Sequence, residues 1–179
     1  MISVNEAEKL ISKNLPNKIA KSVGLIESHG KILVDDVFSP IASPTYTNSA
    51  MDGFAVRWED LSKPDAKLQI IGESCAGAPF YEKLTSGKAI RINTGAMVSD
   101  GADTVVPIEN CEVECDFVKI LSVKNQGQHI RFKGEEFAKG DILLEKNTLI
   151  QSQQIGLLAS VGVAEISVFV PPIVSIVVT

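Results

Sequence analysis

The sequence has few of the residues that build disulfide frameworks, histidine-based sites or nucleic-acid interfaces. Its 179 residues include three cysteines and two histidines, and 17 Lys and Arg stand against 22 Asp and Glu, a formal net charge of −5. Three cysteines are an odd number and do not indicate a disulfide framework. Binding to a phosphate backbone requires a basic footprint, which an acidic chain lacks. We therefore expect no nucleic-acid partner.

Long apolar runs and targeting signals are also missing. The most apolar stretch, residues 166–179, is interrupted by Pro171 and Pro172 and is shorter than the ~20 residues that span a bilayer. The N-terminus has no basic segment followed by an apolar one, as a secretory signal would have. We expect a cytoplasmic protein with no membrane partner.

Common catalytic signatures are absent from the sequence. It has no P-loop, no HExxH, no nucleophile elbow and no dinucleotide-binding glycine motif after a strand. The sequence has only two histidines, His29 in a Ser-His-Gly turn and His129 beside Gln128, which argues against a serine or cysteine triad. Cys111 and Cys115 are spaced more widely than the tight pairs of structural zinc sites. We expect these cysteines to be small apolar residues.

Apolar residues make up 45% of the sequence, enough for a core. The local pattern changes along the chain from helix-like to strand-like and back. Ser3 and Glu6 have the spacing of a capping box, which predicts an N-terminal helix, and Ser152 is predicted to cap a second one. Between them, short Val- and Ile-rich runs separated by turn residues predict antiparallel strands in a small barrel or sandwich. The predicted strands are residues 53–57, 67–74, 89–93, 104–108, 117–123 and 142–144, and a further strand is expected at 164–170.

These signals predict an α+β fold. Residues 1–42 and 145–172 are expected to form one αβ domain, and residues 43–144 an inserted small antiparallel β-barrel-like domain. Residues 173–179, almost all apolar, predict a strand buried on both faces. Because an uncovered apolar strand would be an exposed edge, we expect it to begin a further domain that this chain lacks. The alternative is a terminal strand in the chain's own sheet.

Three loops concentrate polar residues. Residues 45–50 contain hydroxyl and amide groups and precede Asp52-Gly53, which is also typical of an ordinary hairpin turn. Residues 91–96 place Thr94 and Gly95 after a strand, and such a turn can present N–H groups to an oxyanion. Residues 131–136 carry alternating charges around a glycine, and their chemistry alone favours a solvated turn.

The segments NSAMDGFAV, RINTGAMVSDGADTVVPIE and GQHIRFKGEE, in this order, resemble the molybdopterin molybdenumtransferase family, which comprises bacterial MoeA and the E domain of gephyrin. The resemblance covers essentially the whole chain and matches the N-terminal region of the family. It implies a magnesium-dependent insertion of molybdenum from molybdate into adenylylated molybdopterin, with release of AMP. In that family residues 173–179 would lead into a molybdopterin-binding domain, so this fragment is expected to be inactive alone.

The resemblance also implies partners. Family members are elongated homodimers whose active cleft combines this region of one subunit with the later domain of the other. A molybdopterin-adenylylating protein is a further expected partner. Because E domains also act as dimerising scaffolds, the alternative function is a non-catalytic dimerisation module.

Position by position, the resemblance implies that Asp52, Thr94 and Glu136 are catalytic and that Asp52 and Glu136 bind the metal. Glu136 stands where the family has an aspartate. Two like charges 4 Å apart repel by about 1 kcal/mol in water, so bare carboxylates would repel an anionic substrate, and a bound Mg²⁺ would reverse that sign. Thr94 is expected to donate a hydrogen bond to an oxyanion. The expected cofactor-binding residues are Ser49, Arg91, Gly95, Arg131 and Lys133.

Two other roles for these residues stay open at this point. Asp52 could act as a general acid or base instead of a metal ligand. A free-standing β-barrel hydrolase using Asp52 and Glu136 is disfavoured by the repulsion argument if its substrate is anionic.

Overall fold

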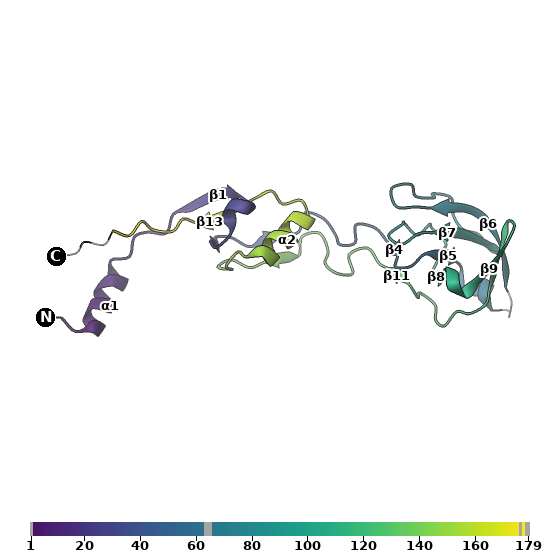
Figure 1. The fold of residues 1–179 in the computed structure, drawn as a ribbon, viewed down its shortest axis with the longest axis horizontal. Helices are drawn as coiled ribbons and strands as arrows, with labels where there is room; N and C mark the ends of the chain where they lie inside the picture. The colour runs from purple at the N-terminus through teal and green to yellow at the C-terminus, as the bar shows by residue number, and fades with distance from the viewer. Residues whose placement is uncertain (1, 63–65, 176, 178–179) are drawn as a thin grey trace. The chain divides into compact units, whose positions relative to one another are not determined.

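The computed structural model describes residues 2–62, 66–175 and 177, and it shows a mixed α+β chain with two helices and thirteen strands (Figure 1). The α+β class expected from the sequence is confirmed. The chain divides into two compact units, one made of Met1–Pro40 and Gly140–Thr179 and the other of Ile41–Lys139. The three polar loops all fall in the second unit.

The first unit is built on a three-stranded antiparallel sheet in the order β1-β13-β2, formed by Ala20–Gly24, Glu165–Phe169 and Ile32–Leu33. A second antiparallel pair joins β3 (Val37–Phe38) to β12 (Ile142–Leu144). The sheet pairs strands from both ends of the chain, as Figure 1 shows for β1 and β13. The buried core of this unit consists of Val23, Leu33, Ile150, Leu158, Ile166 and Val168.

Helix α1 (Val4–Lys13) begins at Ser3, as the capping box predicts. The Ser3 N–H donates to the Glu6 carboxylate over 2.8 Å, and the Glu6 N–H donates to the Ser3 hydroxyl over 3.3 Å. The helix has no buried residue. Val4 and Ile11 are 75% and 65% exposed, so the described chain leaves the apolar stripe of α1 uncovered.

Helix α2 (Ser152–Ser160) is present, but Ser152 is its first helical residue and not its cap. Gln151 is the N-cap, with an extended backbone, and its N–H donates to Gln154 Oε1 over 3.1 Å. A glutamine at the third helical position can supply the reciprocal half of a capping box. The N-cap is therefore Gln151, one residue before the predicted Ser152. Gly162 follows the helix with φ +80°, as its C-terminal signal predicts.

The second unit is built on a six-stranded sheet, curled into a half-barrel, in the order β8-β5-β7-β6-β10-β9 (Figure 1). The strands are β5 (Gly53–Val56), β6 (Lys67–Ser74), β7 (Lys88–Ile92), β8 (Thr104–Pro107), β9 (Cys111–Glu114) and β10 (Phe117–Ile120). A short antiparallel pair joins β4 (Asn48–Ser49) to β11 (Ile130–Arg131). The 3-10 turns are η1 (Ile26–Ser28), η2 (Trp58–Leu61) and η3 (Ile108–Asn110).

The expectation of a purely antiparallel sheet is wrong for one pair, because β6 and β7 run parallel. A parallel pair needs a crossover connection of about a dozen residues. Residues 75–87 supply it, and they include a small turn in which Cys75 and Ala78 exchange backbone hydrogen bonds of 3.1 and 3.0 Å.

Both faces of the sheet are buried around its central strands. Phe54 and Val56 pack into one core cluster, while Ala55 packs into another with Ile90 and Val105. All four residues of β5 are buried. The residue that precedes β5, Asp52, is therefore attached to a fully buried strand of the unit.

Residues 173–175 and 177 lie in no strand, and Ile173 and Val174 are 98% and 76% exposed. Residues 176, 178 and 179 of the expected terminal strand lie outside the described residues. The strand and the domain it would begin stay a prediction. None of the helices in the described residues combines the length and the apolar character needed to cross a membrane.

Candidate functional site

Asp52 and Thr94, which lie 42 residues apart in the sequence, meet where β5 begins and β7 ends, within the six-stranded sheet. Strands β5 and β7 are antiparallel neighbours, and Gly53 lies opposite Ile92. The residues that precede β5 and follow β7 are therefore brought together. The Thr94 N–H and the Thr94 hydroxyl both donate to Asp52 Oδ1, over 2.6 and 2.8 Å.

Gly53 fixes the backbone that carries Asp52. A Cβ at this position would lie 2.0 Å from the carbonyl oxygen of Val106 on β8, so only glycine permits this approach of the two strands. The Asp52 carbonyl accepts the Ile108 N–H over 3.0 Å. The Asp-Gly pair is thus a constraint of the sheet as well as a turn signal.

The Asp52 carboxylate is exposed and is held in its charged form. The hydrogen bonds from the Thr94 N–H, first, and from the Thr94 hydroxyl lower the pKa of Asp52 from its ordinary value, because both donors favour the carboxylate over the acid. Oδ2 accepts no hydrogen bond from the residues that the structure describes. Asp52 therefore presents one free, charged oxygen to solvent.

The backbone N–H groups of the turn after Thr94 are already used inside the protein. The Gly95 N–H donates to the Ser49 carbonyl over 2.8 Å and the Ala96 N–H to the Asn93 carbonyl over 2.9 Å. Gly95 has φ +79°, which a glycine adopts without strain. This bonding does not agree with the expectation of a turn that offers its N–H groups to an oxyanion. The Thr94 hydroxyl proton, expected to face an oxyanion, is likewise donated to Asp52.

Ser49 is fully buried and shapes the loop from within. Its hydroxyl donates to the Met51 carbonyl over 2.6 Å, and the Met51 N–H donates back to the hydroxyl over 3.2 Å. Such local bonds are typical of serine in turns. In this structure Ser49 orients the segment that ends at Asp52, and its hydroxyl is not available to a cofactor.

Asn48, the first residue of the NSAMDG segment, was not among the expected site residues. Its Oδ1 atom is buried and has no hydrogen-bond partner among the described residues, although a buried acceptor without a partner is costly. Its Nδ2 group donates to the Tyr46 carbonyl over 3.4 Å. The concentration of amide and hydroxyl residues before Asp52 was the available signal, but it does not single out Asn48.

The third polar loop is joined to the chain just before β4. The Ser43 hydroxyl donates to Glu136 Oε2 over 2.6 Å, and the Glu136 N–H donates to the Ser43 carbonyl over 3.0 Å. The Lys133 N–H donates to Thr47 Oγ1 over 3.3 Å. These bonds attach residues 133–136 to the segment that leads into the Asp52 loop, but no hydrogen bond or ion pair of the described chain joins Glu136 to Asp52.

The three expected cationic residues are all exposed. Arg91 Nε lies 3.8 Å from Glu73 Oε1, with both side chains about half exposed, and such surface pairs contribute little. Arg131 lies opposite Asn48 in the β4–β11 pair. Lys133 follows it at the loop tip, exposed in the same way. The structure leaves these charges at the surface of the unit that carries Asp52.

The donor set fits part of a magnesium site. Mg²⁺ is usually bound by one or two carboxylates together with phosphate oxygens and waters, and the charged, free Oδ2 of Asp52 suits the first of these. Within residues 2–62, 66–175 and 177 no group of three or more His, Cys, Asp or Glu side chains could hold a metal alone. The chain can therefore supply a carboxylate ligand, but not a complete protein cage.

Comparison with known proteins finds one family that matches most of the chain. The family described as the MoeA N-terminal region (domains I and II) matches residues 2–162. A Haemophilus influenzae protein named molybdopterin molybdenumtransferase is 36% identical over 171 residues, covering 94% of this chain and 42% of the relative. A protein of the same name from Staphylococcus epidermidis is 35% identical over 183 residues, covering 99% of this chain and 43% of the relative.

A solved structure agrees. The crystal structure of the molybdopterin biosynthesis moeA protein from Pyrococcus horikoshii superimposes with a TM-score of 0.83 at 32% identity, covering 94% of this chain and 46% of that one. The chain thus spans less than half the length of these relatives.

Proposed function

Because the chain belongs to the MoeA N-terminal family, whose named relatives are molybdopterin molybdenumtransferases, we propose that it forms the front part of an enzyme that inserts molybdenum from molybdate into adenylylated molybdopterin. In this proposal the chain contributes one wall of an active cleft, and a second subunit contributes the remainder. The relatives are more than twice as long as this chain, which supports a second domain that supplies the rest of the cleft.

The observation that carries the proposal is the Asp52–Thr94 pair. A carboxylate whose pKa is lowered is a weak general base and is not protonated near neutral pH, so it cannot serve there as a general acid. It is well suited to hold positive charge. This favours the metal-binding role of Asp52 over the acid–base role.

Each residue then has a distinct task. Asp52 would hold the metal through Oδ2, because Thr94 donates two hydrogen bonds to Oδ1 and so orients the carboxylate. Bound Mg²⁺ supplies the positive charge that lets a carboxylate lie beside an anionic pyrophosphate. Glu136, which is bonded to Ser43, would be the second carboxylate available to the ion. Arg91, Arg131 and Lys133 attract the anionic substrate to this surface.

Homodimer formation is part of the proposal, and the uncovered apolar stripe of α1 supports it. Val4, Leu10 and Ile11 are 75%, 51% and 65% exposed, and isolated helices of this length are unstable in water without packing. The same stripe favours the second candidate function, a non-catalytic dimerisation module. A molybdopterin-adenylylating protein, as the supplier of the substrate, and a cytoplasmic location complete the proposal.

The test is AMP release by the full-length protein that contains this chain, supplied with adenylylated molybdopterin, molybdate and Mg²⁺. We expect Asp52→Asn to lower the rate about 100-fold, the cost of losing one electrostatic contact to the transition state. The matched control is Asp35→Asn, which removes an exposed carboxylate of the other unit. If Asp52→Asn retained the full rate, the role given to Asp52 would be wrong. If the wild type released no AMP while forming a dimer, the dimerisation module would be the better account.

A further inference from the structure

A pocket of about 290 Å³ opens on the second unit, apart from the residues of the proposed site. It is formed by the end of η3 and by the loop that connects β10 to β11. Its lining residues are Asn110, Val123, Lys124, Asn125, Gln128 and His129.

The lining chemistry favours an anion. It comprises one ammonium group, one imidazole and three amides, and no carboxylate belongs to it. Lysine, histidine and amide side chains all have N–H groups that can donate to an oxyanion. This lining contrasts with the net charge of −5 of the chain as a whole.

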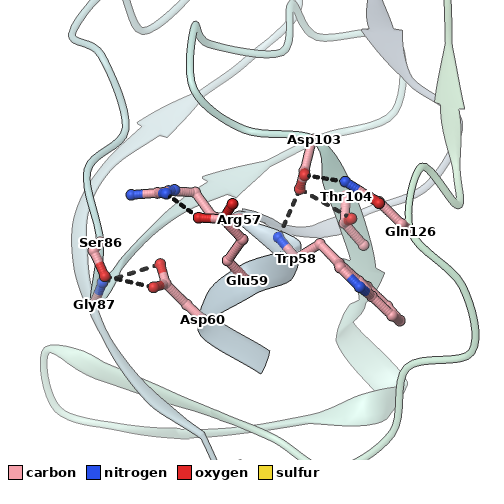
Figure 2. Close-up of polar contacts among 9 residues, drawn as sticks. All are labelled: Arg57, Trp58, Glu59, Asp60, Ser86, Gly87, Asp103, Thr104 and Gln126. Atoms are coloured by element: carbon pink, nitrogen blue, oxygen red, sulfur yellow. Dashed lines mark hydrogen bonds and ion pairs between the residues drawn. The ribbon is translucent and has the colours of Figure 1, made fainter. Parts of the chain in front are cut away.

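The loop that forms the pocket is held in place by Asp103 (Figure 2). The Asp103 Oδ2 atom accepts from the Gln126 amide over 2.8 Å, while Oδ1 accepts the Trp58 N–H over 2.6 Å and the Thr104 hydroxyl over 3.1 Å. One carboxylate thus joins the loop to the ends of β5 and β8. These bonds hold the loop against the sheet.

Further bonds attach the same loop to strand β8. The Gly127 N–H donates to the Asp103 carbonyl over 3.1 Å, and the Val105 N–H donates to the Gln128 carbonyl over 3.1 Å. The Gln128 side chain donates to the Val105 carbonyl over 3.3 Å and accepts the Lys124 N–H over 3.2 Å. A loop that is held by its own hydrogen bonds loses less entropy when it binds a small ion.

The backbone of His129 has a left-handed conformation, which is often found at functional positions. Its φ is +58°, a value that is uncommon outside glycine. The His129 carbonyl accepts the Ala50 N–H over 2.8 Å. Because the Asp52 carbonyl accepts the Ile108 N–H of η3, the pocket borders the Asp52 loop through both of its walls.

We propose that this pocket binds a phosphate-type oxyanion, with the Lys124 ammonium, the His129 imidazole and the Asn110 and Asn125 amides as donors. The ion is either free in solution or the phosphate group of a nucleotide. The proposal does not depend on the proposed function, because binding to the chain is measured without turnover.

The test is a titration of the ¹⁵N-labelled 179-residue chain with inorganic phosphate, molybdate and AMP in chloride buffer, followed by NMR. We expect saturable shifts of the amide signals of residues 124–129. Lys124→Gln should weaken binding about tenfold, because it removes a charge-assisted hydrogen bond. His129→Asn should weaken it several-fold while keeping the left-handed backbone, which asparagine tolerates. Lys83→Gln, the same charge change at an exposed residue outside the pocket, should leave the affinity unchanged.

The three titrants distinguish the sources of the ion. AMP bound at least tenfold tighter than phosphate identifies a nucleotide phosphate, and equal affinities identify a free oxyanion. The proposal is overturned if none of the titrants gives saturable shifts, or if Lys83→Gln weakens binding as much as Lys124→Gln. Circular dichroism of each variant checks the fold, and Lys124 is an exposed residue whose replacement should not disturb it.

Discussion

Thr94 directs both its backbone N–H and its hydroxyl at a single oxygen of Asp52, over 2.6 and 2.8 Å. This arrangement leaves the second oxygen of Asp52 without a partner among the described residues. The carboxylate is thereby fixed by one oxygen and available through the other. Neither residue alone produces this arrangement, which arises because β5 and β7 are antiparallel neighbours.

We predict that the pKa of Asp52 lies below its ordinary value and that Thr94→Val raises it only in part. The backbone N–H is the larger cause of the shift and the hydroxyl the smaller one, and valine keeps the first and removes the second. Carboxyl ¹³C NMR across pH 2–7 measures both values. Thr45→Val, at an exposed threonine of the same unit, should not shift the pKa. An unshifted Asp52 in the wild type would contradict the geometry.

The same shift predicts a pH dependence of stability. A carboxyl whose pKa is lowered in the folded state stabilises the protein above its unfolded pKa of about 4, and this contribution disappears as the pH falls through the lower folded value. The difference in free energy of unfolding between wild type and Asp52→Asn should therefore be constant from pH 5 to 7 and shrink below about pH 4. Urea unfolding at each pH measures it, and a difference that grows on acidification would exclude this account.

Gly53→Ala should destabilise the second unit by about 1–3 kcal/mol, the usual cost of inserting a methyl group where there is no room. The added Cβ would meet the Val106 carbonyl oxygen at 2.0 Å. Gly156→Ala in α2 is the matched control, because nothing lies within 4 Å of its Cβ and alanine favours a helix by up to ~1 kcal/mol. Denaturant unfolding of both variants should give opposite signs; equal stability of Gly53→Ala and wild type would contradict the register of β5 and β8.

Asp103→Asn should cost about 2 kcal/mol of stability, within the range for hydrogen bonds to a charged group. Asparagine has one acceptor oxygen for the three donors that Asp103 now satisfies, those of Trp58, Thr104 and Gln126. Because the chain has one tryptophan, its fluorescence reports directly on this site. Asp60, which accepts bonds from Ser86 and the Gly87 N–H (Figure 2), offers a comparison: Asp60→Asn should lower stability without the same change in the Trp58 spectrum.

Cys111 should react slowly with iodoacetamide and Cys115 rapidly. Burial, and then the nearby Glu109 carboxylate, raise the pKa of Cys111 to about 11, so little reactive thiolate exists at pH 8. Cys115 is exposed. Mass spectrometry of timed samples locates each alkylation, and equal rates at the two cysteines would show that the region around β9 opens in solution.

Local signals in the sequence predicted most of the elements. The Ser3–Glu6 capping box located α1, and short Val- and Ile-rich runs between turn residues located β6 and β12 at their observed bounds. These features depend on neighbouring residues alone. The parallel pairing of β6 and β7 depends on how residues 75–87 cross the sheet, which no local pattern records.

In the candidate site, too, the sequence pointed to individual residues but not to their tertiary contacts. The resemblance of the NSAMDG and Thr-Gly-Ala segments pointed to Asp52 and Thr94, and the structure brings them into contact. The direction of the Thr94 hydroxyl, toward Asp52 and not outward, follows from the register of two strands. The pairing of Glu136 with Ser43 is likewise a tertiary contact between residues 93 positions apart, and the sequence alone gives no reason for it.

The most direct test of the central claim, that Asp52 acts through a metal ion, measures how Mg²⁺ affects the binding of adenylylated molybdopterin to the full-length protein. The account predicts that Asp52→Asn raises the Mg²⁺ concentration required for half-maximal binding, and that Thr94→Val raises it less, by about tenfold as for residues that orient a metal ligand. If Asp52→Asn abolishes AMP release while the Mg²⁺ requirement for binding stays at the wild-type value, Asp52 does not act through the metal.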